Sequence, residues 1–307
     1  MSFDVDKTVK AIKDMRIRGA LDIAIASADT LYGVVNSEAR DTNELLSMLR
    51  DAGEKLKSAR PTAISLPNSV NYIIYVAERN KDLALDEFRE KLSAEIKNFI
   101  NEQKNAIDKI AEIGSRLVDD NDRILTHCQS DTVINLLRRV NEEGKEIDVI
   151  CTETRPRYQG RISARLLAKY KIPVTLIVDS AAFLAMKELN VDKVIVGADT
   201  IYANGDLINK IGTSQIALFA KELDIDFIVA SESIKFSPES VIGSKVVIEE
   251  RPAREVIRSH IEGVEVFNPA FDITHAEYID MIITEFGVIP PQAVYSIVRE
   301  KFGWKLR

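Results

Sequence analysis

The sequence predicts an α/β protein that combines a parallel-sheet domain with an N-terminal helical domain. From residue 123 onward, short apolar runs alternate with helical segments, which is typical of βαβ units joined by right-handed crossovers. Before residue 119, apolar residues recur at three- and four-residue spacings, which is typical of amphipathic helices. We therefore expect the helical domain over residues 1–118 and the α/β domain, with most of the functional site, over residues 119–307.

The composition agrees with a two-domain globular protein. A chain of 307 residues exceeds the commonest size of one domain, and 46% of its residues are hydrophobic. The net charge of -7 argues against broad nucleic-acid binding, although it leaves room for a small basic pocket. Two cysteines are too few for a disulfide framework, residues 1–18 lack the apolar block of a signal peptide, and no apolar run approaches the ~20 residues of a membrane helix. We expect a cytoplasmic protein with no nucleic-acid or membrane partner.

The helical part contains two long segments rich in helix formers, residues 38–57 and 84–118. The second carries one apolar stripe, made of Leu92, Ile96, Phe99, Ile107, Ile110 and Leu117. Pro61 and Pro67 interrupt the helical pattern, so we expect a rigid loop near residues 59–63. A second loop is expected at residues 16–20, where Gly19 lets the backbone approach a ligand closely.

The α/β part predicts its elements in strict alternation. Strands are expected at residues 123–128, 147–152, 174–178, 193–196 and 227–230. Helices are expected at residues 131–143, 161–170 and 181–189, and after Lys210.

Four polar segments lie where these elements change, at residues 126–130, 153–156, 197–199 and 209–213. In an open parallel sheet, the carboxyl ends of the strands are where ligands bind. A thiol, a carboxylic acid and several cations would therefore face one crevice. This set suits proton transfer on a small phosphorylated substrate.

Cys128 ends a strand and comes just before Ser130, a good N-cap for the next helix. A helix start favours anions, so this position predicts a lowered thiol pKa and a role as base or nucleophile. The alternative is a buried structural cysteine, which is the commoner case for a single free thiol. Cys151, inside an apolar strand, is expected to serve packing alone.

The three histidines predict no metal site. His127 neighbours Cys128, so on a strand its ring points to the opposite face and a Cys–His pair is not expected. His260 and His275 show no metal-ligand spacing.

Asp199 follows the apolar run at residues 194–196. Burial there would raise the pKa of its carboxyl group and keep it protonated as a general acid. The alternative is a turn residue that accepts hydrogen bonds from backbone N–H groups. The position alone does not decide between them.

Cationic residues supply candidate phosphate contacts. Residues 204–206 predict a turn, and residues 209–213 are expected to open a helix whose N–H groups form a phosphate site with Lys210. The sequence lacks the glycine spacing of dinucleotide-binding loops and the Walker pattern of triphosphate-binding loops, so no dinucleotide or triphosphate cofactor is implied. Lys210 and Lys235 could instead be solvated surface residues. Arg18 and Arg60 lie in glycine- or proline-bearing loops, where a guanidinium fork suits phosphate. Arg155 and Arg157 are expected to orient loops or neighbouring subunits.

Together these segments resemble the family shared by methylthioribose-1-phosphate isomerase, archaeal ribose-1,5-bisphosphate isomerase and the regulatory subunits of eukaryotic translation initiation factor 2B. The resemblance runs from about Arg16 to the C-terminus. Its matching pieces are Arg18-Gly19-Ala20, Arg60-Pro61-Thr62-Ala63, Thr126-His127-Cys128, Glu153-Thr154-Arg155-Pro156, Gly197-Ala198-Asp199, Asn204-Gly205, Asn209-Lys210-Ile211-Gly212-Thr213 and Asn268-Pro269-Ala270-Phe271-Asp272.

Finer details separate the branches of this family. Thr200 stands where the methylthioribose enzymes usually have Arg, and residues 66–68, 170–173 and 232–236 look more like the ribose-1,5-bisphosphate isomerases. The regulatory subunits generally do not keep both Cys128 and Asp199, so an enzyme is favoured. Gln129 departs from the His that often follows the Cys.

The resemblance implies a Rossmann-like domain and an aldose–ketose isomerase that converts ribose 1,5-bisphosphate to ribulose 1,5-bisphosphate in nucleoside monophosphate degradation. It implies Cys128 as proton acceptor, Asp199 as proton donor, no cofactor, and homo-oligomers in which dimers can assemble into a hexamer. The alternatives are a methylthioribose-1-phosphate isomerase and a non-catalytic regulatory subunit. The implied substrate contacts are Arg18, Gly19, Ala20, Leu21, Arg60, Ser130, Asp131, Thr132, Asn209, Lys210 and Lys235.

Overall fold

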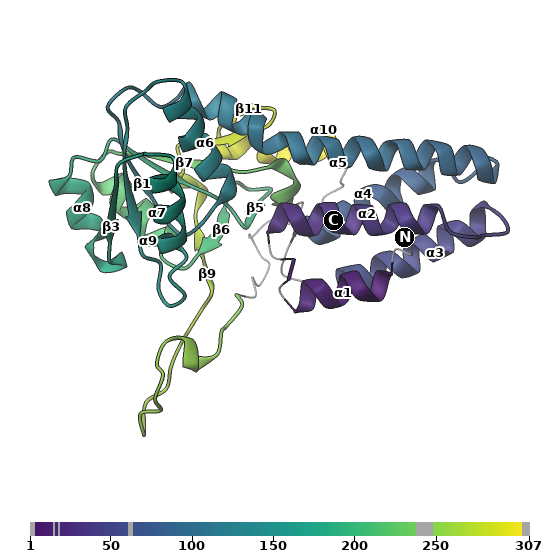
Figure 1. Cartoon of the computed structure of the whole chain (residues 1–307), viewed down its shortest axis with the longest axis horizontal. Helices are drawn as coiled ribbons and strands as arrows, with labels where there is room; N and C mark the ends of the chain where they lie inside the picture. The colour runs from purple at the N-terminus through teal and green to yellow at the C-terminus, as the bar shows by residue number, and fades with distance from the viewer. Residues whose placement is uncertain (1–3, 15, 18, 61–63, 238–247, 303–307) are drawn as a thin grey trace. The chain divides into compact units, whose positions relative to one another are not determined.

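The computed structural model describes residues 4–14, 16–17, 19–60, 64–237 and 248–302. The chain divides into two compact units, residues 1–105 and 106–307. Helix α5 (Leu85–Ser115) contributes to both units, since the division falls within it (Figure 1).

Unit 1 is helical. It contains α1 (Val5–Lys13), α2 (Ala20–Val35), α3 (Thr42–Lys57), α4 (Ser65–Arg79) and the first part of α5. The expected helix at residues 38–57 begins at Thr42 because Asp41 caps it, accepting a hydrogen bond from the Glu44 N–H at 2.9 Å. Hydroxyl groups of α4 tie it to α2: Ser65 Oγ donates to the Ala20 carbonyl at 2.7 Å, and Ser69 Oγ donates to that of Ala24 at 2.9 Å. These buried bonds fix the start of α2.

Unit 2 is built on a seven-stranded sheet, counted over the described residues. Its strands are β1 (Arg123–Thr126), β2 (Asp148–Thr152), β3 (Val174–Ile177), β4 (Lys193–Val196), β7 (Asp226–Ala230), β10 (Met281–Thr284) and β11 (Gly287–Ile289). The order is β3-β2-β1-β4-β7-β10-β11, parallel throughout except for β11. The strand order reverses between β1 and β4, which is the switch point where open sheets bind ligands.

Helices cover both faces of this sheet (Figure 1). These helices include α6 (Asp131–Glu142), α7 (Gly160–Lys169), α8 (Ala182–Glu188), α9 (Thr213–Glu222) and α10 (Val294–Phe302). Unit 2 also contains short 3₁₀ turns, namely η1 (Asp179–Ala181), η2 (Ser233–Lys235), η3 (Ala253–Glu255), η4 (Ala276–Tyr278) and η5 (Pro291–Ala293). Alternate strand residues enter opposite cores: Leu125 packs with α8 and α9, whereas Ile124 packs with α6 and α7. The predicted α/β fold with a Rossmann-like parallel sheet is confirmed.

A second, four-stranded sheet supplies part of the site. Its order is β8-β5-β6-β9, with β5 (Thr200–Tyr202), β6 (Leu207–Lys210), β8 (Phe236–Ser237) and β9 (Phe271–Thr274). The expected turn at residues 204–206 is confirmed, since it joins the antiparallel strands β5 and β6. The expected helix after Lys210 is confirmed, since α9 begins at Thr213, but Asn209 and Lys210 end strand β6 and do not form its first turn. Pairing with the distant strand β9 holds these residues extended.

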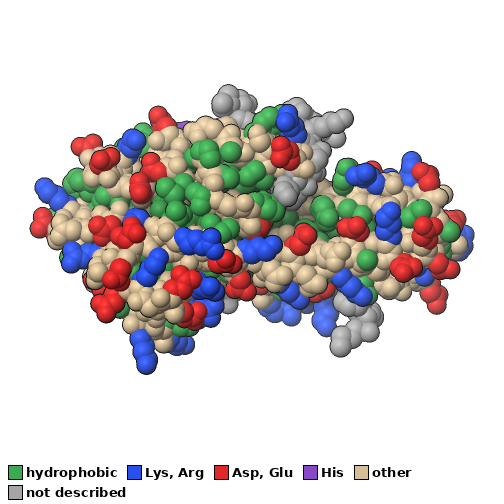
Figure 2. All heavy atoms as spheres, turned by 90° about the horizontal axis from the view of Figure 1, so that it is seen from above, with side chains coloured by type: hydrophobic (Ala, Val, Ile, Leu, Met, Phe, Trp, Pro, Cys, Tyr) green, Lys and Arg blue, Asp and Glu red, His purple; other side chains and the backbone are tan. Residues whose placement is uncertain are grey.

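Acidic and basic side chains are interspersed over the face drawn in Figure 2. Pairs four residues apart occur at helix ends, such as Arg139 of α6 with the C-cap Glu143 at 2.6 Å and Arg116 with Glu112 of α5 at 2.8 Å. Exposed pairs of this kind contribute little to stability. Among the described residues, no helix is both long enough and apolar enough to span a lipid bilayer.

Candidate active site

The two residues with predicted catalytic roles follow the two strands that flank the switch point. Cys128 lies two residues after β1, and Asp199 lies three residues after β4. Cys128 has a φ of 67°, a left-handed conformation that is uncommon for a residue with a side chain. Such a conformation persists where the surroundings hold it, and it often accompanies function.

Two hydrogen bonds hold the backbone of Cys128. Its N–H donates to Thr154 Oγ1 at 2.9 Å, and its carbonyl accepts from Ser163 Oγ of α7 at 2.8 Å. Asp179 in turn holds the loop that carries Thr154, since its carboxylate accepts from the N–H groups of Thr154 and Arg155 at 2.7 and 2.6 Å. The backbone of Cys128 is therefore held by residues that follow β1, β2 and β3 together with Ser163 of α7.

Burial raises the pKa of Cys128 to about 11, and the carboxylates of Asp199 and Asp179 add to this rise. The Lys210 ammonium and the Gln129 N–H act in the opposite direction, but they do not compensate. The expected lowering of this pKa by the helix start is therefore wrong in direction, because desolvation outweighs it. The same interactions place Asp199 and Lys210 within electrostatic range of the sulfur. The other cysteine, Cys151, is fully buried, as expected, and burial raises the pKa of its thiol to about 12.

Gly197 brings the Asp199 loop against the start of α6. A Cβ atom at Gly197 would lie 2.5 Å from Ser130 Oγ, so only glycine permits this approach. Ser130 is the N-cap of α6, as expected, and accepts from the Val133 N–H at 3.4 Å. Asp199 is half-buried, and its own N–H donates to the Ile208 carbonyl of β6 at 3.1 Å.

The start of α9 is already occupied by a carboxylate. Asp272 of β9 accepts from the Gly212 N–H at 2.7 Å, and from the N–H and hydroxyl of Ser214 at 3.2 and 2.8 Å. The expectation that these N–H groups bind phosphate is therefore wrong. Lys210 remains, with its ammonium 4.5 Å from the centre of the Phe271 ring.

His127 joins the end of β1 to the loop before α9. Its Nε2 lies 2.9 Å from the Ile211 carbonyl, which can only accept, so Nε2 carries the proton. Its Nδ1 then accepts from Thr152 Oγ1 at 2.6 Å. Burial lowers the pKa of His127, which keeps the ring neutral. Both nitrogens are thus engaged, and His127 does not pair with Cys128, as expected.

A buried ion pair lies beside the first turn of α6. Lys235 is 7% exposed, and its Nζ lies 2.7 Å from Glu232 Oε2. Thr132 Oγ1 donates to Glu232 Oε1 at 2.9 Å. Burial opposes the charge of Glu232, but Lys235 and these hydrogen bonds outweigh it and lower the pKa of Glu232. The alternative that Lys235 is solvated is wrong.

The remaining predicted substrate contacts lie in unit 2, at the start of α2, and at Arg60 and Arg18. Asp131 in α6 accepts from Gln129 Nε2 at 3.1 Å, and Asn209 Nδ2 donates to Thr213 Oγ1 at 3.1 Å. Gly19 is the N-cap of α2 in unit 1, where no described side chain caps the helix, and Ala20 and Leu21 form its first turn. Arg60, also in unit 1, is half-buried, whereas Arg18 lies outside the described residues.

Sequence reasoning assigned no individual role to Asp179, Thr154 and Ser163, which support Cys128, or to Glu232, which pairs with Lys235. Asp179 had a usable signal, since it follows β3 as Cys128 follows β1. Ser163 had none, because its role depends on how α7 packs. Over the described part of the chain, no three His, Cys, Asp or Glu side chains are placed to hold a metal ion.

Comparisons with known proteins identify the family of this chain. The ribose 1,5-bisphosphate isomerases of Methanocaldococcus jannaschii and Pyrococcus furiosus are each 45% identical to this chain, over 98% and 99% of it and 96% of their own length. The solved 5-methylthioribose 1-phosphate isomerase of Pyrococcus horikoshii OT3 matches with a TM-score of 0.80 and 33% identity, covering 97% of this chain and 88% of that one. The model of the initiation factor 2 subunit family matches residues 16–291. The chain therefore belongs to the initiation factor 2 subunit family.

Proposed function

We propose that this protein is an aldose–ketose isomerase that converts ribose 1,5-bisphosphate to ribulose 1,5-bisphosphate. The observation that carries the proposal is the near-full-length similarity, at 45% identity, to two proteins named for that activity. The thiol of Cys128 and the carboxyl of Asp199, at the switch point of one sheet, support the chemistry.

In this proposal, Asp199 donates a proton to the ring oxygen and the furanose opens. Cys128 acts through its thiolate, a minor form at pH 7 because of its raised pKa, and removes the proton from C2, which leaves an enol between C1 and C2. Asp199 then takes the proton of the C2 hydroxyl while C1 receives the proton held by Cys128, and the ketone forms. Each group ends in the protonation state in which it began, so no cofactor is required. Acid–base groups of this kind typically contribute about 100- to 10,000-fold in rate.

The two phosphate groups require cationic or N–H donors. Lys210 supplies a charge close enough to the sulfur to lower its pKa. At the start of α2, no side chain of the described residues caps the backbone N–H groups, which can therefore bind a phosphate, although the first turn also contains the acidic Asp22. The proposed contacts remain Arg18, Gly19, Ala20, Leu21, Arg60, Ser130, Asp131, Thr132, Asn209, Lys210 and Lys235. We also propose a cytoplasmic homo-oligomer of dimers that can assemble into a hexamer.

The direct test is turnover of ribose 1,5-bisphosphate by the purified protein, with 5-methylthioribose 1-phosphate as the competing substrate. We expect a kcat/KM at least 100-fold higher for the bisphosphate, because a thioether cannot use the cations that would bind a second phosphate. Greater activity on the methylthio sugar would replace the proposed substrate. No turnover of either sugar would favour a non-catalytic regulatory role.

The raised pKa of Cys128 predicts its reactivity toward iodoacetamide, which requires the thiolate. With a pKa of about 11, the thiol is nearly all protonated at pH 7, so alkylation should speed up about tenfold per pH unit until it levels off near pH 11. Lys210→Gln should move the profile to higher pH, since Lys210 lowers this pKa, and Asp199→Asn should move it to lower pH. Mass spectrometry of the Cys128 peptide gives the rate, with the buried Cys151 as internal reference. A plateau below pH 8 would contradict the structure.

A further inference from the structure

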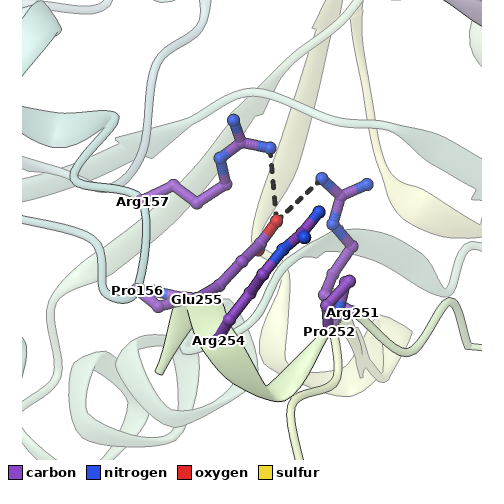
Figure 3. Close-up of a pocket in the computed structure, with 6 residues that line it drawn as sticks. All are labelled: Pro156, Arg157, Arg251, Pro252, Arg254 and Glu255. Atoms are coloured by element: carbon purple, nitrogen blue, oxygen red, sulfur yellow. Dashed lines mark hydrogen bonds and ion pairs between the residues drawn. The ribbon is translucent and has the colours of Figure 1, made fainter. Parts of the chain in front are cut away.

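A cavity of ≈ 610 Å³ lies in unit 2, against the loop after β2 that also carries Thr154. Its walls are the loop that follows β2 and the segment that carries η3, which extends from the two sheets as the yellow-green part of the chain (Figure 1). It is lined by Pro156, Arg157, Arg251, Pro252, Arg254 and Glu255 (Figure 3). None of these is a proposed catalytic residue or substrate contact.

One carboxylate organises the arginines of this cavity. Glu255 Oε1 lies 3.4 Å from a guanidinium nitrogen of Arg157 and 3.1 Å from one of Arg251 (Figure 3). A second nitrogen of Arg251 reaches Glu249 at 2.7 Å. The side chains converge from two segments that are about 100 residues apart in the sequence. The tertiary fold therefore assembles this cluster.

The cluster keeps unused donors and one unused acceptor. Arg254 is exposed and makes no ion pair with any residue that the structure describes. Arg157 uses one of its five N–H groups on Glu255 and is half-exposed. The other oxygen of Glu255, Oε2, is buried and has no hydrogen-bond partner within the described residues. Three guanidinium groups face two carboxylates, so the site keeps a net positive charge in a chain whose formal charge is -7.

Hydrogen bonds within the protein hold the two walls of the cavity. Arg155 of the β2 loop donates from Nη2 to the Val256 carbonyl at 3.0 Å, which joins the two segments. On the far side, the Arg251 N–H donates to the Asn268 carbonyl at 2.8 Å, and Asn268 Nδ2 donates to the Pro252 carbonyl at 3.2 Å. Pro156 and Pro252 further restrict the backbone. A preformed cavity loses little conformational entropy when it is filled.

We propose that this cavity is a second anion site, which binds a phosphate monoester on a hydroxylated carrier such as a pentose. Guanidinium forks match phosphate oxygens in geometry and charge, and Arg157 and Arg254 supply them. Glu255 Oε2 is an acceptor for a carrier hydroxyl group. The volume falls in the range of small-molecule sites and exceeds what a lone phosphate fills.

Equilibrium binding to the full chain tests this, with inorganic phosphate and ribose 5-phosphate as probes in isothermal titration calorimetry. We expect Arg157→Gln/Arg254→Gln to bind one phosphate fewer per chain than the wild type, or to bind it at least tenfold more weakly. The matched control is Arg258→Gln, an exposed arginine of the same segment outside the cavity, which should bind like the wild type. Glu255→Gln removes a negative charge and should bind inorganic phosphate more tightly.

Unchanged stoichiometry and affinity in Arg157→Gln/Arg254→Gln would overturn the proposal. So would an equal loss in Arg258→Gln, which would indicate diffuse attraction to a basic surface. If the wild type bound inorganic phosphate and ribose 5-phosphate equally tightly at this site, the proposal that the site recognises a hydroxylated carrier would be wrong. Since binding is measured without turnover, these results do not depend on the isomerase activity, and far-ultraviolet circular dichroism identifies any misfolded variant.

Discussion

Cys128→Ser is expected to lower kcat for ribose 1,5-bisphosphate by about 1,000- to 10,000-fold. A hydroxyl group holds its proton more tightly than a thiol, so it is a far weaker source of the base that removes the C2 proton. The bonds that hold residue 128 involve its backbone N–H and carbonyl, so they survive the change and the fold should remain. Initial rates at saturating substrate, normalised to folded protein, measure the effect.

The matched control is Cys151→Ala, which removes the other thiol from the β2 core. It should cost stability but leave kcat within a few fold, because Cys151 serves packing. A Cys128→Ser variant that keeps more than a tenth of wild-type kcat would refute the thiol as proton acceptor. A substrate labelled with deuterium at C2 gives a second criterion, since transfer through the thiol exchanges the label with water and a hydride shift retains it.

Gly160→Ala is expected to cost at least about 3 kcal/mol of the free energy of unfolding. An added Cβ atom would lie 1.8 Å from the Thr152 carbonyl oxygen at the end of β2, and backbone cannot yield as a flexible side chain does. The start of α7 must then move away from the sheet and take Ser163, one turn later, with it. Activity should fall as well, because Ser163 holds the Cys128 carbonyl. The midpoint and slope of urea unfolding, compared between Gly160→Ala and the wild type, measure the loss.

Gly263→Ala is the control variant. It measures the loss of unfolding free energy caused by replacing a glycine where the added Cβ atom causes no clash. A Cβ atom at Gly263 would meet no atom within 4 Å, and the positive φ of 74° alone should cost about 1 kcal/mol. Its activity should stay at the wild-type level. Equal losses of stability in the two variants would show that α7 can shift freely, against the close packing described here.

Strands β1, β2, β3, β4 and β7 of the main sheet could be predicted because each is a short apolar run in a pattern that alternates with helical segments. Strands β10 and β11 were not predicted. The small sheet could not be predicted in this way. Strand β5 has three residues, and β6 pairs with β9, whose residues lie more than 60 positions later in the chain. A pattern read along the sequence does not show such a partner. The helix after Lys210 could therefore be predicted, whereas the strand that Lys210 ends could not.

The site shows the same division between local and distant effects. The positions of Cys128 and Asp199 followed from a local rule, since both come after parallel strands. The pKa of Cys128 did not, because the helix start that favours a thiolate is visible in the sequence whereas the burial that opposes it is a tertiary property. Asp272 likewise reaches the start of α9 from a strand 60 residues away. Competition between such effects is decided by packing, which periodicity does not encode.

The carboxylate that caps α9 has an evolutionary consequence. Because the positive end of this helix is neutralised within the protein, its backbone contributes no fixed preference for an anionic substrate. Selectivity at that edge of the crevice then depends on exchangeable side chains such as Lys210. A single codon change there can alter which charge is tolerated while the helix stays capped. One ancestral scaffold could in this way give rise to enzymes for differently charged sugars without rebuilding its framework.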